Sequence, residues 1–156
     1  YEISCSLVGS EMCIRDRDYT DTHLAIMTAL KKGATDIYIL GATGTRMDHT
    51  ITNIGNMKVV ADCGKDCHIV DEHNYIYLLS EADGIHIIRK DSQYGRYVSI
   101  IPMSENVSLS LEGFKYTLDN YELKQGLSIC QSNEVEDEQG IIKVHKGLII
   151  VLETKD

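Results

Sequence analysis

The chain has 156 residues, of which 43% are hydrophobic and 25% are charged, a composition typical of a soluble globular protein with one domain or two small ones. Its formal net charge of -9 argues against a general nucleic-acid or membrane-surface binder, because both partners are polyanionic. No apolar run approaches the roughly 20 residues that span a bilayer, and we find no export-signal pattern, so we expect a cytoplasmic protein.

The first seventeen residues show no clean amphipathic pattern. Their stretch Glu11-Met-Cys-Ile-Arg-Asp16 resembles the translation of a transposase adaptor used in sequencing-library preparation. We therefore exclude residues 1–17 from fold reasoning as a non-native segment and expect no native packing partner for them. The alternative is a genuine, variable N-terminus.

A helix is expected from about Asp21 to Lys32. Thr20 or Asp18 can cap its start, because both side chains accept hydrogen bonds from amides of the first turn. Gly33 fits the position just after its end, where a left-handed backbone is common. This segment begins an α/β unit.

A short buried strand is predicted over 36–40, followed by a glycine-rich loop at its carboxyl end, where open α/β sheets bind ligands. Beyond the loop a spacing of three to four apolar residues predicts a helix that Gly64 ends. The residues on this spacing are Met47, Ile51, Ile54 and Met57. We expect Met47 and Met57 to lie in the core.

The loop has the residue types of a phosphate site. Gly41 and Gly44 let backbone amides approach an anion, and the following helix start favours negative charge. Arg46 suits phosphate oxygens, and Asp48 offers the hard oxygen ligands that Mg²⁺ prefers. The structural alternative is that Asp48 simply caps the helix.

Five cysteines, an odd number, show no disulfide-framework spacing: Cys5, Cys13, Cys63, Cys67 and Cys130. Cys63 and Cys67 lie close to His68 in the sequence and suggest a zinc site, but no second pair of ligands follows. We expect reduced thiols at a helix end.

After about residue 72 the helical spacing gives way to short runs rich in Ile, Val and Tyr. They cover 74–79, 85–89, 97–101, 107–111, 127–131, 141–144 and 148–152. The acidic stretch 134–138 is expected to be a solvated hairpin loop. The predicted fold is thus a partial α/β domain with a parallel sheet over 18–72, followed by an all-β sandwich over 73–156.

The loop Gly41-Ala-Thr-Gly-Thr-Arg-Met-Asp-His-Thr-Ile-Thr-Asn53 resembles the signature of thiamine pyrophosphokinases. Asp18-Tyr-Thr-Asp21 is similar to an upstream element of that family. Three later segments resemble the C-terminal half of the family: Lys90–Tyr94, Gly113–Tyr116 and Ser132–Glu134. The resemblance covers Asp18 to the C-terminus. It implies transfer of pyrophosphate from ATP to thiamine, giving thiamine diphosphate and AMP, with Mg²⁺ neutralising the phosphates.

The resemblance also implies roles for individual residues. Asp21 and Asp48 fit the metal-binding carboxylates and, with Arg46, form the catalytic set. ATP binding is assigned to Thr20, Gly41, Gly44, Arg46, His49 and Asn53. The β domain is expected to pair two subunits in a homodimer and to line the thiamine pocket with Ser132 and Asn133.

His49 and Asn53 need a separate interpretation, since a histidine beside an aspartate suggests a general base. For His49 we favour a bond to neighbouring backbone over direct catalysis. Asn53, one turn further on the same helix face, is expected to order the loop from behind.

The sequence departs from the family in one respect, because the acidic Gly-Asp-Phe-Asp-Ser element is not found and the only phenylalanine is Phe114. We therefore expect a truncated N-terminus and little activity in the chain as it stands. Two other functions stay open: a non-catalytic thiamine-binding or dimerisation module, and a related nucleotide phosphotransferase or hydrolase. Release of AMP with and without thiamine distinguishes them.

Overall fold

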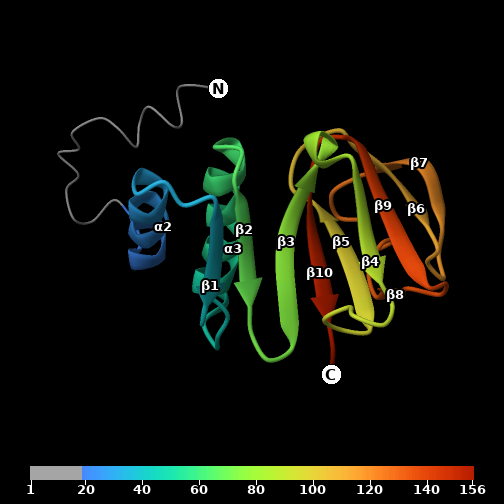
Figure 1. Cartoon of the computed structure of the whole chain (residues 1–156), viewed down its shortest axis with the longest axis horizontal. Helices are drawn as coiled ribbons and strands as arrows, with labels where there is room; N and C mark the ends of the chain where they lie inside the picture. Colours follow the sequence, from blue (N-terminus) through green and yellow to red (C-terminus); the bar gives the residue numbers. More distant parts are fainter. Residues whose placement is uncertain (1–18) are drawn as a thin grey trace. The chain divides into compact units, whose positions relative to one another are not determined.

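The structure is a computed structural model that describes residues 19–156. The segment 1–17, Asp18 as a helix cap, and the thiols of Cys5 and Cys13 lie outside the described residues. The chain divides after Asp71 into two units, which are treated separately below (Figure 1). In the described part of the chain, no helix has the length and apolar character needed to cross a membrane.

The first unit contains two helices and a pair of parallel strands. Its elements are α2 (Asp21–Lys31), β1 (Asp36–Leu40), α3 (Met47–Asp62) and β2 (Asp66–Val70). β1 and β2 pair in parallel, and Leu40 lies opposite Val70 at their carboxyl ends. Because parallel neighbours need a crossover connection, the chain returns through α3, which packs on both β2 and α2.

The ends of the helices agree with the sequence predictions. The Thr20 hydroxyl caps α2 by accepting a hydrogen bond from the His23 amide at 3.3 Å. Gly33 follows the helix with φ of +87°, a conformation that a residue with a side chain rarely adopts. Cys63 caps the end of α3, and Gly64 leaves it with φ of +65°.

Two predictions about burial in this unit were wrong. Alternate residues of β1 face outward, leaving Tyr38 61% and Leu40 76% exposed, because β1 is the last strand of its sheet among the described residues. Met57 is fully buried, but Met47 is 60% exposed, since it is the first residue of α3 and lies off the face formed by Asn53, Met57 and Val60. Strand β2 was also missed; its buried side chains are only Cys67 and Ile69.

The second unit is a sandwich of two antiparallel sheets joined by short turns (Figure 1). One carries the order β3 (Asn74–Ser80), β10 (Leu148–Thr154), β5 (Tyr97–Pro102) and β8 (Asn133–Glu134). The other carries β4 (Ile85–Arg89), β9 (Gln139–Lys146), β6 (Val107–Glu112) and β7 (Leu118–Leu123). A single 3-10 turn, η1 (Glu81–Asp83), links β3 to β4 among the described residues.

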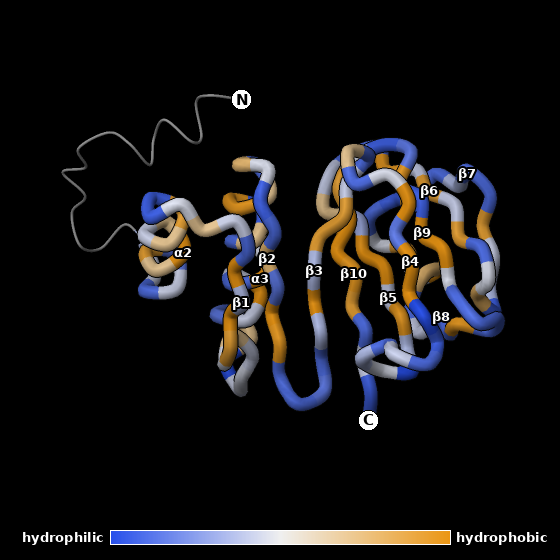
Figure 2. Tube along the Cα trace, in the orientation of Figure 1, coloured by the Kyte–Doolittle hydropathy of each residue, from blue (hydrophilic) through white to orange (hydrophobic). Residues whose placement is uncertain are grey.

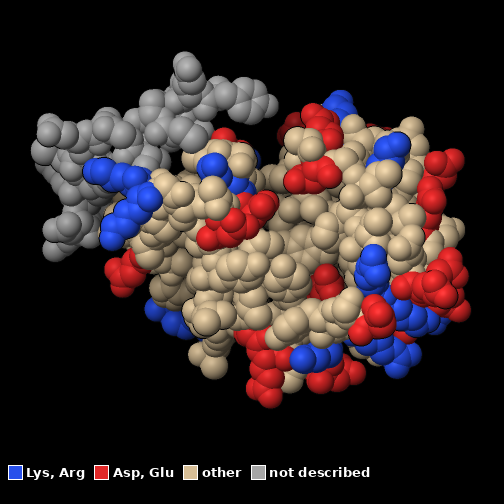
Figure 3. All heavy atoms as spheres, in the orientation of Figure 1, with Lys and Arg blue, Asp and Glu red and all other residues tan. Residues whose placement is uncertain are grey.

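Alternating apolar residues from both sheets form one core in this unit, and Figure 2 shows the apolar stretches along β3, β10 and β5. Leu109, Ile142, Ile149 and Val151 are fully buried there. On the face shown in Figure 3, acidic and basic side chains lie intermixed over this unit, as expected for a solvated surface. The predicted sandwich is thus confirmed.

Two segments of the sandwich differ from the prediction. Residues 127–131 form turns rather than a strand, because only Cys130 is buried while Leu127 and Ile129 are about half exposed. The missed strand is β7, whose Asp and Asn residues hid its pairing with β6. The acidic stretch is not a plain loop: Glu134 belongs to β8, and Val135 is 4% exposed and bridges to Phe114.

The thiols are likewise distributed differently from the expectation. Cys63 lies at the end of α3, whereas Cys67 lies in β2 and Cys130 in the sandwich, and none of the three forms a disulfide. Burial raises the pKa of both Cys67 and Cys130 to about 11. Such thiols stay protonated at neutral pH and react slowly.

A buried polar chain crosses the sandwich. The Tyr77 hydroxyl donates to the Glu153 carboxylate at 3.0 Å, and the other carboxylate oxygen accepts from the Tyr94 amide at 2.8 Å. Tyr77 also lies 2.9 Å from Nε2 of His86, which must act as the donor because the tyrosine proton is directed to Glu153. Burial, together with the Glu153 charge, raises the pKa of Tyr77.

We predict that Tyr77→Phe lowers the free energy of unfolding by about 1–3 kcal/mol, because it removes a donor from a carboxylate that is only 5% exposed. Urea unfolding followed by circular dichroism measures the loss. Tyr121→Phe is the control, since Tyr121 packs against the same core and makes no side-chain hydrogen bond with the described residues. Equal stability of the two variants would contradict a structural role for the buried chain.

Candidate functional site

The glycine-rich loop lies at the carboxyl edge of the parallel pair. Leu40 and Val70 are register partners, so the residues that follow the two strands meet at the same edge. The hydroxyl of Thr43, in the loop, donates to the carboxylate of Asp71, the residue after β2, at 2.5 Å. The predicted position of the loop is confirmed, although Thr43 and Asp71 were not singled out from the sequence.

The base of the loop is held by α3. Gly41 turns out of β1 with φ of +71°, and the next residue, Ala42, is buried. The carbonyl of Ala42 accepts a hydrogen bond from the side-chain amide of Asn53 at 2.9 Å, and Asn53 is itself only 7% exposed. Asn53 therefore orders the loop from behind, as expected.

The start of α3 has backbone amides without a side-chain cap. Arg46 occupies the capping position and its side chain makes no capping hydrogen bond. Asp48 is the second residue of the helix and does not occupy the capping position, although its carboxylate interacts with the amides of Asp48 and His49. Amides at an uncapped helix start carry partial positive charge and attract anions.

One amide of the loop is engaged by a residue that the sequence analysis missed. The Gly44 amide donates to the hydroxyl of Thr50 at 3.3 Å, and that hydroxyl lies 3.4 Å from the Arg46 carbonyl. The sequence did contain an indication of this contact, because a threonine four residues after the capping position can direct its hydroxyl back toward the start of the helix. Thr50 thus fixes the direction in which the Gly44 amide points.

Arg46 and Asp48 form an exposed two-point ion pair. Arg46 Nε lies 3.2 Å and its terminal nitrogen 2.5 Å from the two carboxylate oxygens of Asp48. The hydrogen bond from Arg46 lowers the pKa of Asp48, so the carboxylate is ionised at neutral pH. Because the two side chains are 70% and 64% exposed, the pair is weak enough to open for a ligand.

The remaining residues predicted for the nucleotide lie at helix starts. Asp21 is exposed on the first turn of α2, next to Thr20, whose hydroxyl oxygen caps the helix while its hydrogen can still donate. His49 is exposed on the first turn of α3. Between residues 19 and 156, no three His, Cys, Asp or Glu side chains gather as a metal site. Mg²⁺ commonly uses one or two carboxylates together with substrate phosphates, which Asp48 fits.

The two residues predicted for thiamine occupy one segment of the second unit. Ser132 is exposed, with φ of +53°, and its amide donates to the Ser99 hydroxyl at 2.9 Å. Asn133 is only 3% exposed, and its side chain bonds both the amide and the carbonyl of Tyr116, at 3.0 and 2.8 Å. Asn133 therefore holds the backbone of Tyr116, whereas Ser132 presents its hydroxyl to solvent.

A hollow of about 410 Å³ in the same unit does not include either residue. Its walls are Arg89, Lys90, Asp91, Glu138 and Gln139. These side chains are polar and mostly charged, unlike the largely apolar walls of a typical small-molecule pocket. The hollow does not by itself indicate a thiamine site.

Two family models match the chain. The one described as "Thiamin pyrophosphokinase, catalytic domain" matches residues 9–70, and "Thiamin pyrophosphokinase, vitamin B1 binding domain" matches residues 85–149. The boundary between them falls where the chain divides into its two units. Together they account for most of the chain.

Curated relatives have the same family name. The chain is 35% identical to thiamine pyrophosphokinase of Bacillus subtilis (strain 168) over 142 residues, covering 90% of this chain and 65% of the relative. It is 32% identical to thiamine pyrophosphokinase 1 of Oryza sativa subsp. japonica, covering 86% of this chain and 53% of that protein. The chain thus spans between about half and two thirds of the length of these relatives.

Solved structures agree with these matches. The crystal structure of thiamine pyrophosphokinase from Bacillus subtilis superposes with a TM-score of 0.82 at 35% identity, over 90% of this chain and 65% of that one. The enzyme from Geobacillus thermodenitrificans gives 0.79 at 31%, over 91% and 64%. From the two family models, these relatives and these structures, the chain belongs to the thiamine pyrophosphokinase family.

Proposed function

We propose that the protein transfers pyrophosphate from ATP to thiamine, giving thiamine diphosphate and AMP. The observation that carries the proposal is the loop between β1 and α3, which combines an uncapped helix start, a braced glycine turn and the Arg46–Asp48 pair. Pyrophosphoryl transfer depends mainly on alignment of the reactants and on neutralising oxygen charge, so it needs such groups more than a nucleophilic side chain.

The loop would bind the ATP phosphates. Arg46 would exchange its bond with Asp48 for phosphate oxygens, and Gly41 and Gly44 would let backbone amides approach them. Thr20 would donate its hydroxyl hydrogen to the nucleotide, and Asn53 would act through the Ala42 carbonyl that it holds. His49 is assigned to this nucleotide side without a proton-transfer role.

Mg²⁺ would be held by Asp48 and Asp21 together with the phosphates. When bound, it supplies the positive charge that offsets the phosphate oxygens. Asp48 is suited to this, because its carboxylate is ionised at neutral pH and exposed. Arg46, whose side chain lies beside Asp48, would then orient the phosphates.

Thiamine would bind beside Ser132 and Asn133. Ser132 offers an exposed hydroxyl, and the buried amide of Asn133 fixes the Tyr116 backbone next to it. We therefore propose a direct contact for Ser132 and an indirect contribution for Asn133. We also propose a cytoplasmic location. We propose that neither nucleic acid nor a membrane surface is a partner, because a net charge of -9 disfavours binding to either polyanion.

The second unit is proposed to pair two chains in a homodimer. Several of its apolar side chains are exposed, among them Ile85 at 61% and Ile87 at 48% on strand β4, and exposed apolar side chains of this kind often mark interfaces. Light scattering should give twice the chain mass at micromolar concentration, and Ile87→Lys should shift the mass toward the monomer. A wild-type monomer would contradict the proposed pairing.

AMP formation tests the function. We compare this chain with an extended chain, in which Tyr1–Arg17 is replaced by the N-terminal residues of a relative. The acidic element that is not found in this sequence would supply carboxylates worth about 3–4 kcal/mol each in transition-state stabilisation. The extended chain should form AMP from MgATP only with thiamine, and this chain should be slower by about two orders of magnitude or more.

Other outcomes would contradict the proposal. AMP or phosphate release by the extended chain without thiamine would favour a nucleotide hydrolase. Thiamine binding without AMP formation would favour a non-catalytic module. Comparable turnover by both chains would leave the assigned activity intact but would contradict the contribution assigned to the acidic element.

A further inference from the structure

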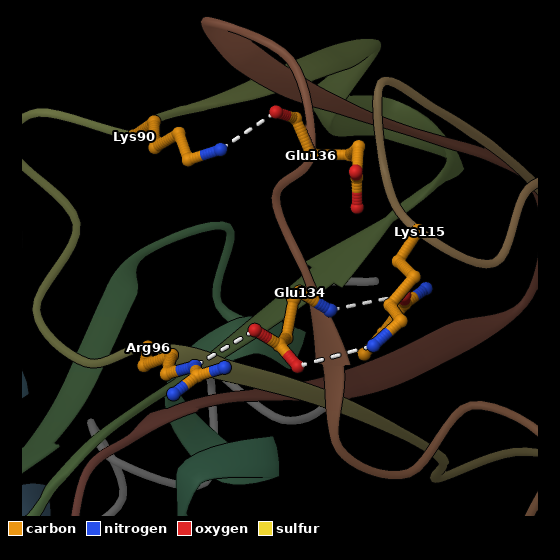
Figure 4. A network of polar contacts seen from close by, with 6 residues as sticks. Lys90, Arg96, Lys115, Glu134 and Glu136 are labelled. Carbon is orange, nitrogen blue, oxygen red and sulfur yellow. Dashed lines mark hydrogen bonds and ion pairs between the residues drawn. The ribbon is translucent and has the colours of Figure 1, made fainter.

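Three cations from different parts of the sandwich converge on the segment that follows Ser132 and Asn133 (Figure 4). Arg96 Nε lies 2.7 Å from one carboxylate oxygen of Glu134, and Lys115 Nζ lies 3.7 Å from the other. Lys90 Nζ donates to the Glu136 carbonyl at 2.6 Å. Arg96 precedes β5, Lys115 lies between β6 and β7, and Lys90 follows β4, so the segment is tied to three elements.

Backbone bonds fix the same segment from the side of residues 113–116. The Glu134 carbonyl accepts from the Lys115 amide at 2.9 Å, and the Glu136 amide donates to the Gly113 carbonyl at 2.9 Å. Gly113 has φ of +72°, and a Cβ there would lie 2.1 Å from the Gln139 carbonyl oxygen. The backbone of residue 113 can therefore lie this close to Gln139 only if residue 113 is glycine.

Glu134 is the link between these ties and the proposed thiamine residues. Its amide donates to the side-chain oxygen of Asn133, whose nitrogen donates to the Tyr116 carbonyl. Its carboxylate stays charged, because the hydrogen bond from Arg96 lowers the pKa of Glu134. A shift of Glu134 would thus be passed directly to Asn133 and Ser132.

The geometry of the cations is restricted further by aromatic rings. Arg96 lies over the Tyr97 ring at 5.5 Å from its centroid, and Lys115 over the Tyr116 ring at 5.8 Å. Exposed ion pairs contribute little to the free energy of unfolding, and Arg96 and Lys115 are 68% and 49% exposed. A role in stability alone is therefore a weak explanation for this arrangement.

We propose that Glu134 is a positioning residue for thiamine: by joining Arg96 to Lys115 it holds Ser132 and Asn133 where the acceptor substrate binds. The inference rests on the proposed function of those two residues. On this proposal, Glu134 affects the binding of thiamine and not the binding of ATP, because the loop proposed to bind ATP belongs to the other unit. Lys90 supports the same segment through the Glu136 backbone.

The test compares Glu134→Gln, Arg96→Ala and the double variant in the extended chain. Glu134→Gln should raise the thiamine KM about two- to fivefold with the ATP KM and the urea midpoint unchanged, in keeping with the strength of partly exposed ion pairs. Arg96→Ala should also raise the thiamine KM, and the double variant should raise it by less than the product of the two single effects, because both substitutions remove the same Arg96–Glu134 ion pair. Added salt should raise the thiamine KM of the wild type more than that of Glu134→Gln.

Asp62→Asn is the matched control, since it removes an ion pair with Lys58 of comparable length, 2.6 Å, on the exposed side of α3. It should leave both KM values unchanged. An unchanged thiamine KM in Glu134→Gln, or an equal rise of both KM values, would overturn the positioning role while AMP formation by the wild type still supports the proposed function. An extended wild type that forms no AMP with thiamine would overturn both.

Discussion

The parallel register between β1 and β2 is the constraint on which the candidate site depends. It places the residues after Leu40 beside those after Val70, so that Thr43 reaches Asp71 across the edge of the pair. The crossover helix α3 then has to start at this same edge, which directs its uncapped amides toward the loop. Asn53 completes the arrangement by holding the Ala42 carbonyl, so contacts within the protein fix the base of the loop.

In the second unit, the segment proposed to contact thiamine is held by contacts other than regular strand pairing. Its segment from Ser132 to Glu138 has little regular pairing of its own, since β8 contains only Asn133 and Glu134. The buried amide of Asn133, the bridge from Val135 to Phe114 and the three cations together replace that pairing. The acidic segment is thereby tied to the neighbouring strands although residues 136–138 are exposed, and the proposed thiamine contact would need such a fixed backbone.

The sequence predicted correctly those features that depend on residues close together in the chain. Thr20, Gly33 and Gly64 act through their own backbone and side chains, so the ends of α2 and α3 were predicted correctly. Prediction failed where burial depends on partners far along the chain: β1 and Met47 are exposed because few described elements cover them, and β7 was missed because its polar residues face solvent. Thr50 and the two-sided bonding of Asn133 are likewise contacts that only the folded backbone reveals.

The central claim is that the loop from Gly41 to Asp48 binds metal-bound phosphate, and calorimetric titration of the chain with MgATP tests it most directly. Arg46→Ala and Asp48→Ala should each weaken binding by about tenfold or more, since each removes a charged hydrogen-bonding group from the phosphates or their metal. Lys58→Ala serves as the control, because Lys58 lies in the same helix and pairs only with Asp62 in the described part of the chain. MgATP affinity unchanged in both loop variants, or lowered equally by the control, would contradict the account.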